Sequence, residues 1–165
     1  MKIGVKGNKH LRKALQLTEN MGIRIILTSI GFESFDDVVL RNLNKGVNVE
    51  TNLKAVNMIR QLKNDFPTHF GYLRNEGGNH GFIHPTPWDS KKTSVNIKKV
   101  SDRYALAADI LPDHSIPLII HHASALGDWI SKIERKEGIL FERYDSIIGW
   151  WEESLLSQDC NCVIN

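Results

Sequence analysis

Histidine and acidic side chains are concentrated in the stretch 68–90. Glu76, His80 and His84 are spaced by four residues, and His122 follows farther along the chain. Imidazole and carboxylate groups together suit zinc or non-haem iron, so a metal-dependent hydrolase using these four residues is one hypothesis. A spacing of four brings ligands together only on a helix, and the intervening glycines oppose a helix. Substrate hydrogen bonding or general acid–base work by His80, His84 or His122 is therefore preferred, with ordinary surface hydrogen bonding as an equal alternative.

A carboxylate and an ammonium mark a second candidate site. The apolar run Ile23–Ile30 is bounded by glycines and predicts a strand buried on both faces, as in a parallel sheet. Glu33 and Ser34 follow the carboxyl end of that strand, where ligands bind in open and barrel α/β folds. Lys45 lies twelve residues after Glu33, at the far end of the next predicted helix.

That helix has recognisable start and stop signals. Ser34 and Asp37 have the spacing of a capping box, and apolar residues then recur at helical intervals. Gly46 is the expected end of the helix. The pattern thus predicts a strand, a turn and a helix that position Glu33 and Lys45.

Similar signals predict the remaining elements. Asn48 is the expected cap of a helix whose inward stripe is Val49, Leu53, Val56, Ile59 and Leu62. Further helices are predicted for 8–21, 94–111, 126–138 and from Asp145, and short strands for 70–73, 81–84 and 116–122. His121 and His122 are adjacent on the last strand, so only one of them can face the inside of a barrel.

The segment GFESFDDVVLRNLNKG (Gly31–Gly46) resembles a segment of the radical S-adenosylmethionine enzymes, especially the cobalamin-binding subgroup. Those enzymes commonly have glycine-x-glutamate-serine, a helix with a spaced leucine, and then asparagine-lysine-glycine. The resemblance implies that Glu33 lies by the ribose or methionine end of S-adenosylmethionine and that Lys45 faces its carboxylate. The alternative is that Glu33 and Lys45 only suit the two ends of a helix dipole.

The resemblance also implies a fold and a substrate surface. The expected fold class is α/β, a partial (β/α) barrel with a mostly parallel, curved sheet of four or five strands flanked by helices. The portion GFI…P-W-D around residues 81–89 is similar to the fifth strand and following loop of the subgroup. The substrate surface, for a small molecule or peptide, would be formed by Arg74, Glu76, His80, His84 and His122.

The cysteine content limits what this chain does alone. The family holds a four-iron four-sulfur cluster with a C-x-x-x-C-x-x-C motif, and this chain has two cysteines, Cys160 and Cys162. The resemblance therefore implies the carboxyl-terminal part of a larger enzyme. We expect it not to ligate the cluster, with cobalamin as an optional cofactor, and not to be catalytic without the cluster-binding part. That missing part, or self-association of the chain, would cover the exposed sheet edge.

Composition sets broader bounds. With 165 residues and 41% hydrophobic content, the sequence predicts a single α/β domain over residues 1–157 and a flexible tail over 158–165. A net charge of +2 gives no electrostatic reason to expect nucleic-acid binding. No apolar stretch is long enough to span a membrane and no signal peptide is evident, so we expect a cytoplasmic location. A non-catalytic scaffold or binding module remains the third hypothesis.

Overall fold

The computed structural model describes residues 5–28, 30–72, 82–110, 115–116, 118–141, 143–144 and 147–149. Within these ranges the protein is a mixed α/β structure with five α-helices and a parallel pair of strands, which confirms the predicted class. The arrangement as part of a barrel stays a prediction. None of the helices in these ranges is both long and apolar enough to cross a membrane.

The chain divides into two compact units, and each is described separately below. The first comprises Met1–Phe82 and Ser90–His114, and the second comprises Ile83–Asp89 and Ser115–Asn165. The prediction of one domain over residues 1–157 is not tested by this division. The predicted tail, 158–165, lies outside the described residues.

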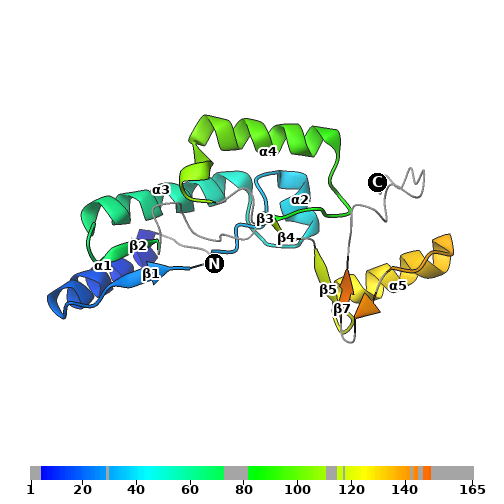
Figure 1. Ribbon diagram of the computed structural model, residues 1–165, viewed down its shortest axis with the longest axis horizontal. Coiled ribbons are helices and arrows are strands. Elements are labelled where there is room, and N and C mark those ends of the chain that lie inside the picture. Colours follow the sequence, from blue (N-terminus) through cyan, green and yellow to red (C-terminus); the bar gives the residue numbers. More distant parts are fainter. Residues whose placement is uncertain are drawn as a thin grey trace. The chain divides into compact units, whose positions relative to one another are not determined.

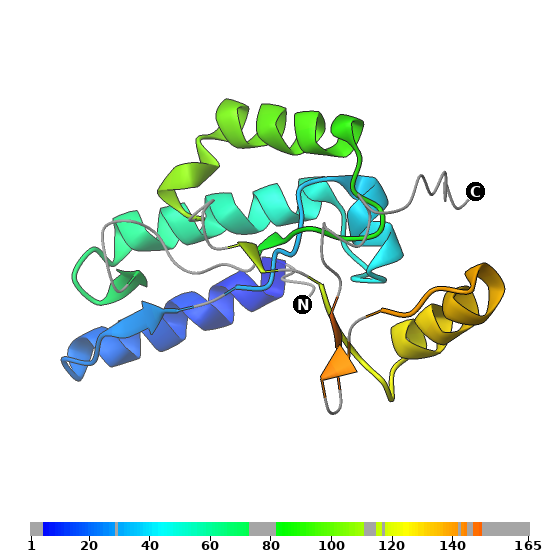
Figure 2. The same ribbon diagram turned by 45° about the vertical axis from the view of Figure 1, so that its right-hand side comes forward.

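Four helices build the first unit: α1 (Val5–Asn20), α2 (Asp37–Asn42), α3 (Val49–Asp65) and α4 (Lys91–Tyr104), the last followed by the 3-10 helix η1 (Leu106–Ala108). Figures 1 and 2 show α3 running between α1 and α4. Helix α1 already includes residue 8, so the prediction that Asn8 caps it was wrong. Helix α4 begins earlier than predicted, because Ser90 and Thr93 form a capping box.

The parallel strands of this unit are short. Strand β1 (Ile25–Leu27) pairs in register with β2 (Phe70–Tyr72). The prediction that this strand is buried on both faces was wrong, because Ile25 and Leu27 pack against the core whereas Ile26 is 36% exposed. Strand alternation places Ile26 on the opposite face from its neighbours, and an apolar run cannot show that only one face is covered.

Helix α3 supplies the centre of the core. Asn48 caps it as predicted, by accepting a hydrogen bond from the backbone of Thr51. Val56, Ile59 and Leu62 of the predicted stripe are buried, and Val49 and Leu53 are packed partly against the core, so the stripe is confirmed. The core is completed by apolar residues from the other elements of this unit: Leu15, Phe32, Phe35, Phe66, Phe70, Tyr72, Leu106 and Ile110.

A partly buried ion pair ties α3 to the segment after α4. Nε of Arg60 donates to Oδ2 of Asp109 at 2.7 Å, and the Tyr72 hydroxyl donates to Oδ1 at 3.0 Å. Arg60 also donates to the carbonyls of Tyr104 and Ala105, both at 2.9 Å. Asp109 is only 2% exposed, so its charge depends on these partners.

The second unit contains β4 (Ser115–Ile116), β5 (Ile119–His121), α5 (Ala125–Glu137), β6 (Arg143–Tyr144) and β7 (Ile147–Gly149). Strand β3 (Phe82–Ile83) lies at the division between the units and pairs with β4. Helix α5 is confirmed, with Ser124 as its N-cap and Gly138 at a φ of 69° as its C-cap. Strands β5, β7 and β6 form an antiparallel sheet in that order.

The predicted last helix was wrong where the chain is described, because residues 147–149 form β7. Ile147 and Ile148 pair with His121 and Ile120 of β5. Both isoleucines are β-branched, a side-chain type that packs better on a pleated sheet than on a helix.

Removing the buried carboxylate should destabilise the first unit. Asp109→Ala leaves the Arg60 guanidinium and the Tyr72 hydroxyl without this acceptor, and we expect a loss of about 3 kcal/mol of unfolding free energy. Urea unfolding measures this loss. The control is Asp102→Ala, which removes an exposed ion pair with Lys98 and should cost less than about 1 kcal/mol. Equal effects in the two variants would contradict the central role of Asp109.

Tyr72 should make stability sensitive to alkaline pH. Burial, and then the charge of Asp109, raises the pKa of the Tyr72 hydroxyl far above its ordinary value of 10.0. Above about pH 10 the unfolded chain releases this proton and the folded chain keeps it, so stability falls as the pH rises, by about 1.4 kcal/mol per pH unit. Tyr72→Phe should remove this slope. Urea unfolding of both proteins at about pH 9 and about pH 11 would show it, and parallel pH curves would refute it.

Candidate functional site

Glu33 and Lys45, the two predicted cofactor contacts, meet in the structure. Nζ of Lys45 donates to Oε1 of Glu33 at 2.7 Å, across twelve residues of sequence. The Lys45 side chain is 35% exposed and the Glu33 side chain 17%. The loop after β1 and the end of α2 therefore place a carboxylate and an ammonium together within reach of solvent.

The backbone around Glu33 has an unusual conformation. Glu33 has a φ of 64°, and the Ser34 amide donates to the Phe32 carbonyl at 2.8 Å, which closes a three-residue γ-turn around Glu33. The positive-φ form of this turn is rare and strained for residues other than glycine. Such strain persists only where neighbouring structure enforces it, and it is found preferentially at functional sites.

Two contacts hold this turn: the backbone of Glu33 forms a parallel bridge with Phe82, and the side chain of Asn52 on α3 binds its neighbours. Nδ2 of Asn52 donates to the carbonyls of Phe32 and Ser34, both at 3.0 Å, and thus binds the backbone on either side of Glu33. Phe32 is also buried in the core. Asn52 is 6% exposed and occupies an inward position of the α3 stripe, four residues before Val56. We did not predict this role, and the available signal was a polar residue within an apolar stripe.

Gly31 makes room for the ion pair. A Cβ atom on Gly31 would lie 2.8 Å from Oε1 of Glu33 and 3.8 Å from Nζ of Lys45. The pair therefore packs directly over the backbone of residue 31. Any side chain there would displace the Glu33 carboxylate. This explains on steric grounds why glycine suits position 31, the first residue of the segment Gly31–Gly46.

Lys45 is positioned by the end of α2. Asn44 has a φ of 53°, its amide donates to the Arg41 carbonyl, and the Lys45 amide donates to the Leu40 carbonyl. These two bonds form a Schellman motif, so Asn44 is the left-handed residue that ends the helix and the prediction that Gly46 ends it was wrong. Asparagine tolerates this conformation because its short side chain is polar.

The start of α2 also differs from the prediction. Asp36, and not Ser34, is the N-cap: its carboxylate accepts from the amides of Val38 and Val39 at 2.9 and 3.3 Å. The Ser34 hydroxyl instead accepts from the Asp36 amide at 3.2 Å. Asn96 of α4 donates to the other oxygen of Asp36 at 3.3 Å. The capping aspartate therefore links α2 to α4, a long-range contact that sequence spacing does not show.

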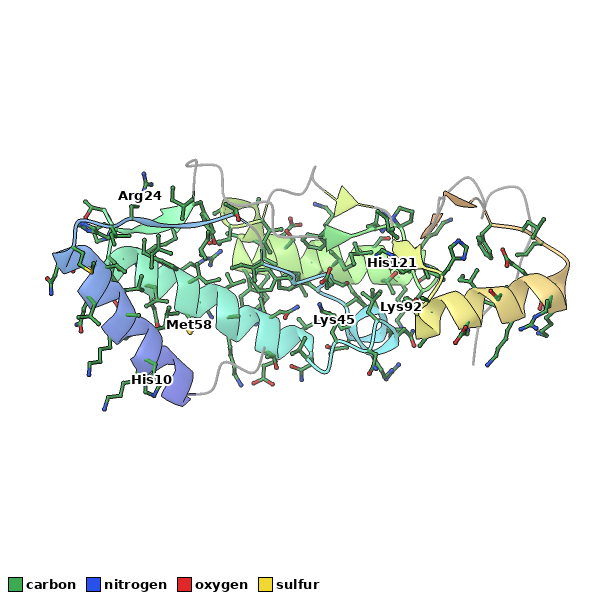
Figure 3. The ribbon with its side chains drawn as sticks, turned by 90° about the horizontal axis from the view of Figure 1, so that it is seen from below. His10, Arg24, Lys45, Met58, Lys92 and His121 are labelled. Atoms are coloured by element: carbon green, nitrogen blue, oxygen red, sulfur yellow. The ribbon has the colours of Figure 1, made fainter. Side chains whose placement is uncertain are left out.

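An open depression of about 340 Å³ adjoins the end of α2. Asn44 and Gly46, on either side of Lys45 in the chain, contribute to its lining, as does Arg41. The remaining lining residues are Val47, Asn48 and Thr51. Figure 3 shows Lys45 next to α2, the helix that contributes Arg41 to this lining.

The predicted substrate residues have different outcomes. Arg74, Glu76 and His80 lie outside the described residues, as do Cys160 and Cys162. His84 and His122 belong to the second unit. Strand β5 ends at His121, which Figure 3 labels, so strand alternation no longer orients His122 as predicted.

His84 has a carboxylate partner that we did not predict. Its Nδ1 lies 3.1 Å from Oδ2 of Asp89. The described residues contain no group of three histidine, cysteine or acidic side chains able to hold a metal ion. Because Glu76 and His80 are outside those residues, the metal-dependent hydrolase remains a prediction.

Comparisons of the chain with models of protein families, with curated proteins and with solved structures found no match.

Asn52→Ala should loosen the turn that presents Glu33. The substitution removes two hydrogen bonds to buried carbonyls, and we expect a loss of about 1–3 kcal/mol in urea unfolding. Asn57→Ala, at an exposed position of the same helix, is the matched control and should change stability by less than about 0.5 kcal/mol. Nuclear magnetic resonance shifts of Glu33 should move in the first variant and stay in place in the second. An unchanged Glu33 in Asn52→Ala would show that the turn does not depend on the amide.

Proposed function

We propose that this chain is part of a radical S-adenosylmethionine enzyme and that Glu33 and Lys45 contact the methionine end of the cofactor. The observation that supports the proposal is the 2.7 Å contact between these two side chains. The family resemblance assigns both side chains to one ligand, S-adenosylmethionine.

The charges of the pair fit the methionine end of the cofactor. That end carries an ammonium and a carboxylate, so the Glu33 carboxylate suits the first and the Lys45 ammonium suits the second. The Lys45 side chain is about one-third exposed, and it can exchange its protein partner for a ligand carboxylate without leaving a deeply buried charge. The strained turn at Glu33 fixes the acidic side of the site in advance.

The role of the chain in this proposal is binding and orientation. Beside a reduced four-iron four-sulfur cluster, S-adenosylmethionine supplies radical chemistry for hydrogen abstraction from a substrate. Two cysteines cannot provide the three thiolates that the family uses, so the cluster would be held by residues that this chain does not supply. The proposal includes a partial barrel, of which the parallel β1–β2 pair would be one part.

Calorimetric titration with S-adenosylmethionine tests the proposal. Glu33→Gln and Lys45→Met remove one charge each at nearly constant shape, and we expect each to weaken binding at least about tenfold. Glu50→Gln and Lys54→Met are the matched controls, because they alter an exposed ion pair on α3. These controls should bind the cofactor as the unmodified chain does.

A second ligand makes the test specific to the methionine end. 5′-Methylthioadenosine lacks the ammonium and the carboxylate, so neither Glu33→Gln nor Lys45→Met should change its affinity. The proposal fails if the unmodified chain does not bind S-adenosylmethionine at millimolar concentration, or if the site variants bind it as well as the controls do.

A further inference from the structure

The second unit contains a histidine held by a nearly buried carboxylate. Nδ1 of His84 lies 3.1 Å from Oδ2 of Asp89. The His84 side chain is 42% exposed, whereas the Asp89 side chain is 10% exposed. The acid is therefore fixed inside the unit while the ring of the histidine reaches solvent.

The segment that carries this pair is anchored at several points. Oδ2 of Asp89 also accepts from the Thr86 amide at 2.5 Å, and the Asp89 amide donates to the Thr86 carbonyl at 3.1 Å. Thr86 is fully buried. The amide of Leu118, just before β5, donates to the Pro85 carbonyl at 3.2 Å. These bonds hold the Asp89 carboxylate in place, so the carboxylate sets the orientation of the His84 ring.

The contact assigns the tautomer of the neutral ring. An ionised carboxylate only accepts hydrogen bonds, so Nδ1 of His84 carries the proton in the contact with Asp89. Nε2 then keeps its lone pair. Among the described residues, none forms a hydrogen bond or ion pair with Nε2. The arrangement leaves a basic nitrogen on an exposed edge of an oriented ring.

An aromatic surface belongs to the same segment. Trp88 precedes Asp89, and its ring lies 5.8 Å from the ring of Trp129 on α5 at an angle of 32°. Both tryptophans are only partly buried. They offer apolar contact to a ligand, which favours a small molecule with an aromatic or apolar group.

We propose that His84 and Asp89 form a proton-transfer dyad that acts on a small molecule bound beside Trp88. Nε2 of His84 accepts a proton from a water molecule or a hydroxyl group of the ligand. The O–H bond breaks, an N–H bond forms, and the electron pair stays on oxygen, which attacks the carbonyl carbon of an ester while the C=O π pair moves onto the carbonyl oxygen. When that pair returns, the ester C–O bond breaks and the leaving alcohol takes the proton from Nε2. Asp89 stabilises the intermediate imidazolium by accepting from Nδ1–H. The dyad does not depend on S-adenosylmethionine binding by the first unit.

Hydrolysis of p-nitrophenyl acetate by the full chain tests the dyad, because this ester is aromatic and its leaving group needs no proton. We expect His84→Gln to lower the second-order rate constant at least about tenfold. Asp89→Asn keeps an oxygen for the Thr86 amide but should also lower the rate. His121→Gln is the matched control, since it removes an exposed imidazole from the same unit and should leave the rate unchanged.

The tautomer tests directly whether Asp89 accepts a hydrogen bond from Nδ1 of His84. Long-range ¹H–¹⁵N spectra of the unmodified chain, recorded at a pH where the His84 ring is neutral, should show its proton on Nδ1. In Asp89→Ala, which leaves Nδ1 without its acceptor, the proton should shift toward Nε2. The proposal is overturned if His84→Gln hydrolyses the ester at the unmodified rate, or if neutral His84 carries its proton on Nε2. Should either Asp89 variant fail to fold, these two measurements still decide the question.

Discussion

The side-chain amide of Asn52 fixes the backbone on both sides of Glu33, whose own backbone forms a bridge with Phe82. A strained positive-φ conformation at a residue other than glycine costs roughly 1–3 kcal/mol, and here it is imposed on a glutamate. Asn52 offsets this cost with two hydrogen bonds from one buried nitrogen, to carbonyls on both sides of the glutamate. Burial of Phe32 in the core fixes the same segment from the other direction. A loop after a short strand thereby becomes a defined position for one carboxylate.

The elements that sequence reasoning predicted best are those with local causes. Helices α3 and α5 have a cap residue, an apolar stripe and a stop signal, and each of these is read within one helix. Strands β1 and β7 were less predictable. The coverage of β1 on one face and the pairing of β7 with β5 depend on segments distant in sequence. An apolar or β-branched run does not reveal how many of its faces will be buried.

The candidate site was also predictable only in part from the sequence. Glu33 and Lys45 were identifiable by residue type and by their place after a strand and a helix, whereas their direct contact required the structure. Asn52, Asp36 and Asp89 were missed because their partners are set by folding of the loops or by other helices. A polar residue in an inward helical position, such as Asn52, is nevertheless a signal that sequence analysis can use, because a buried amide requires partners.

At position 60, the planar shape of the guanidinium contributes contacts that a positive charge alone would not. The Arg60 guanidinium reaches a carboxylate and two carbonyls at the end of α4 at the same time, from a single side chain of α3. An ammonium is a compact point charge and cannot match the planar, forked arrangement of those acceptors. Lysine at position 60 would therefore neutralise Asp109 but leave the carbonyls of Tyr104 and Ala105 without the hydrogen bonds that Arg60 donates. The forked geometry of the guanidinium is thus what allows one side chain of α3 to bind the end of α4 and Asp109 together.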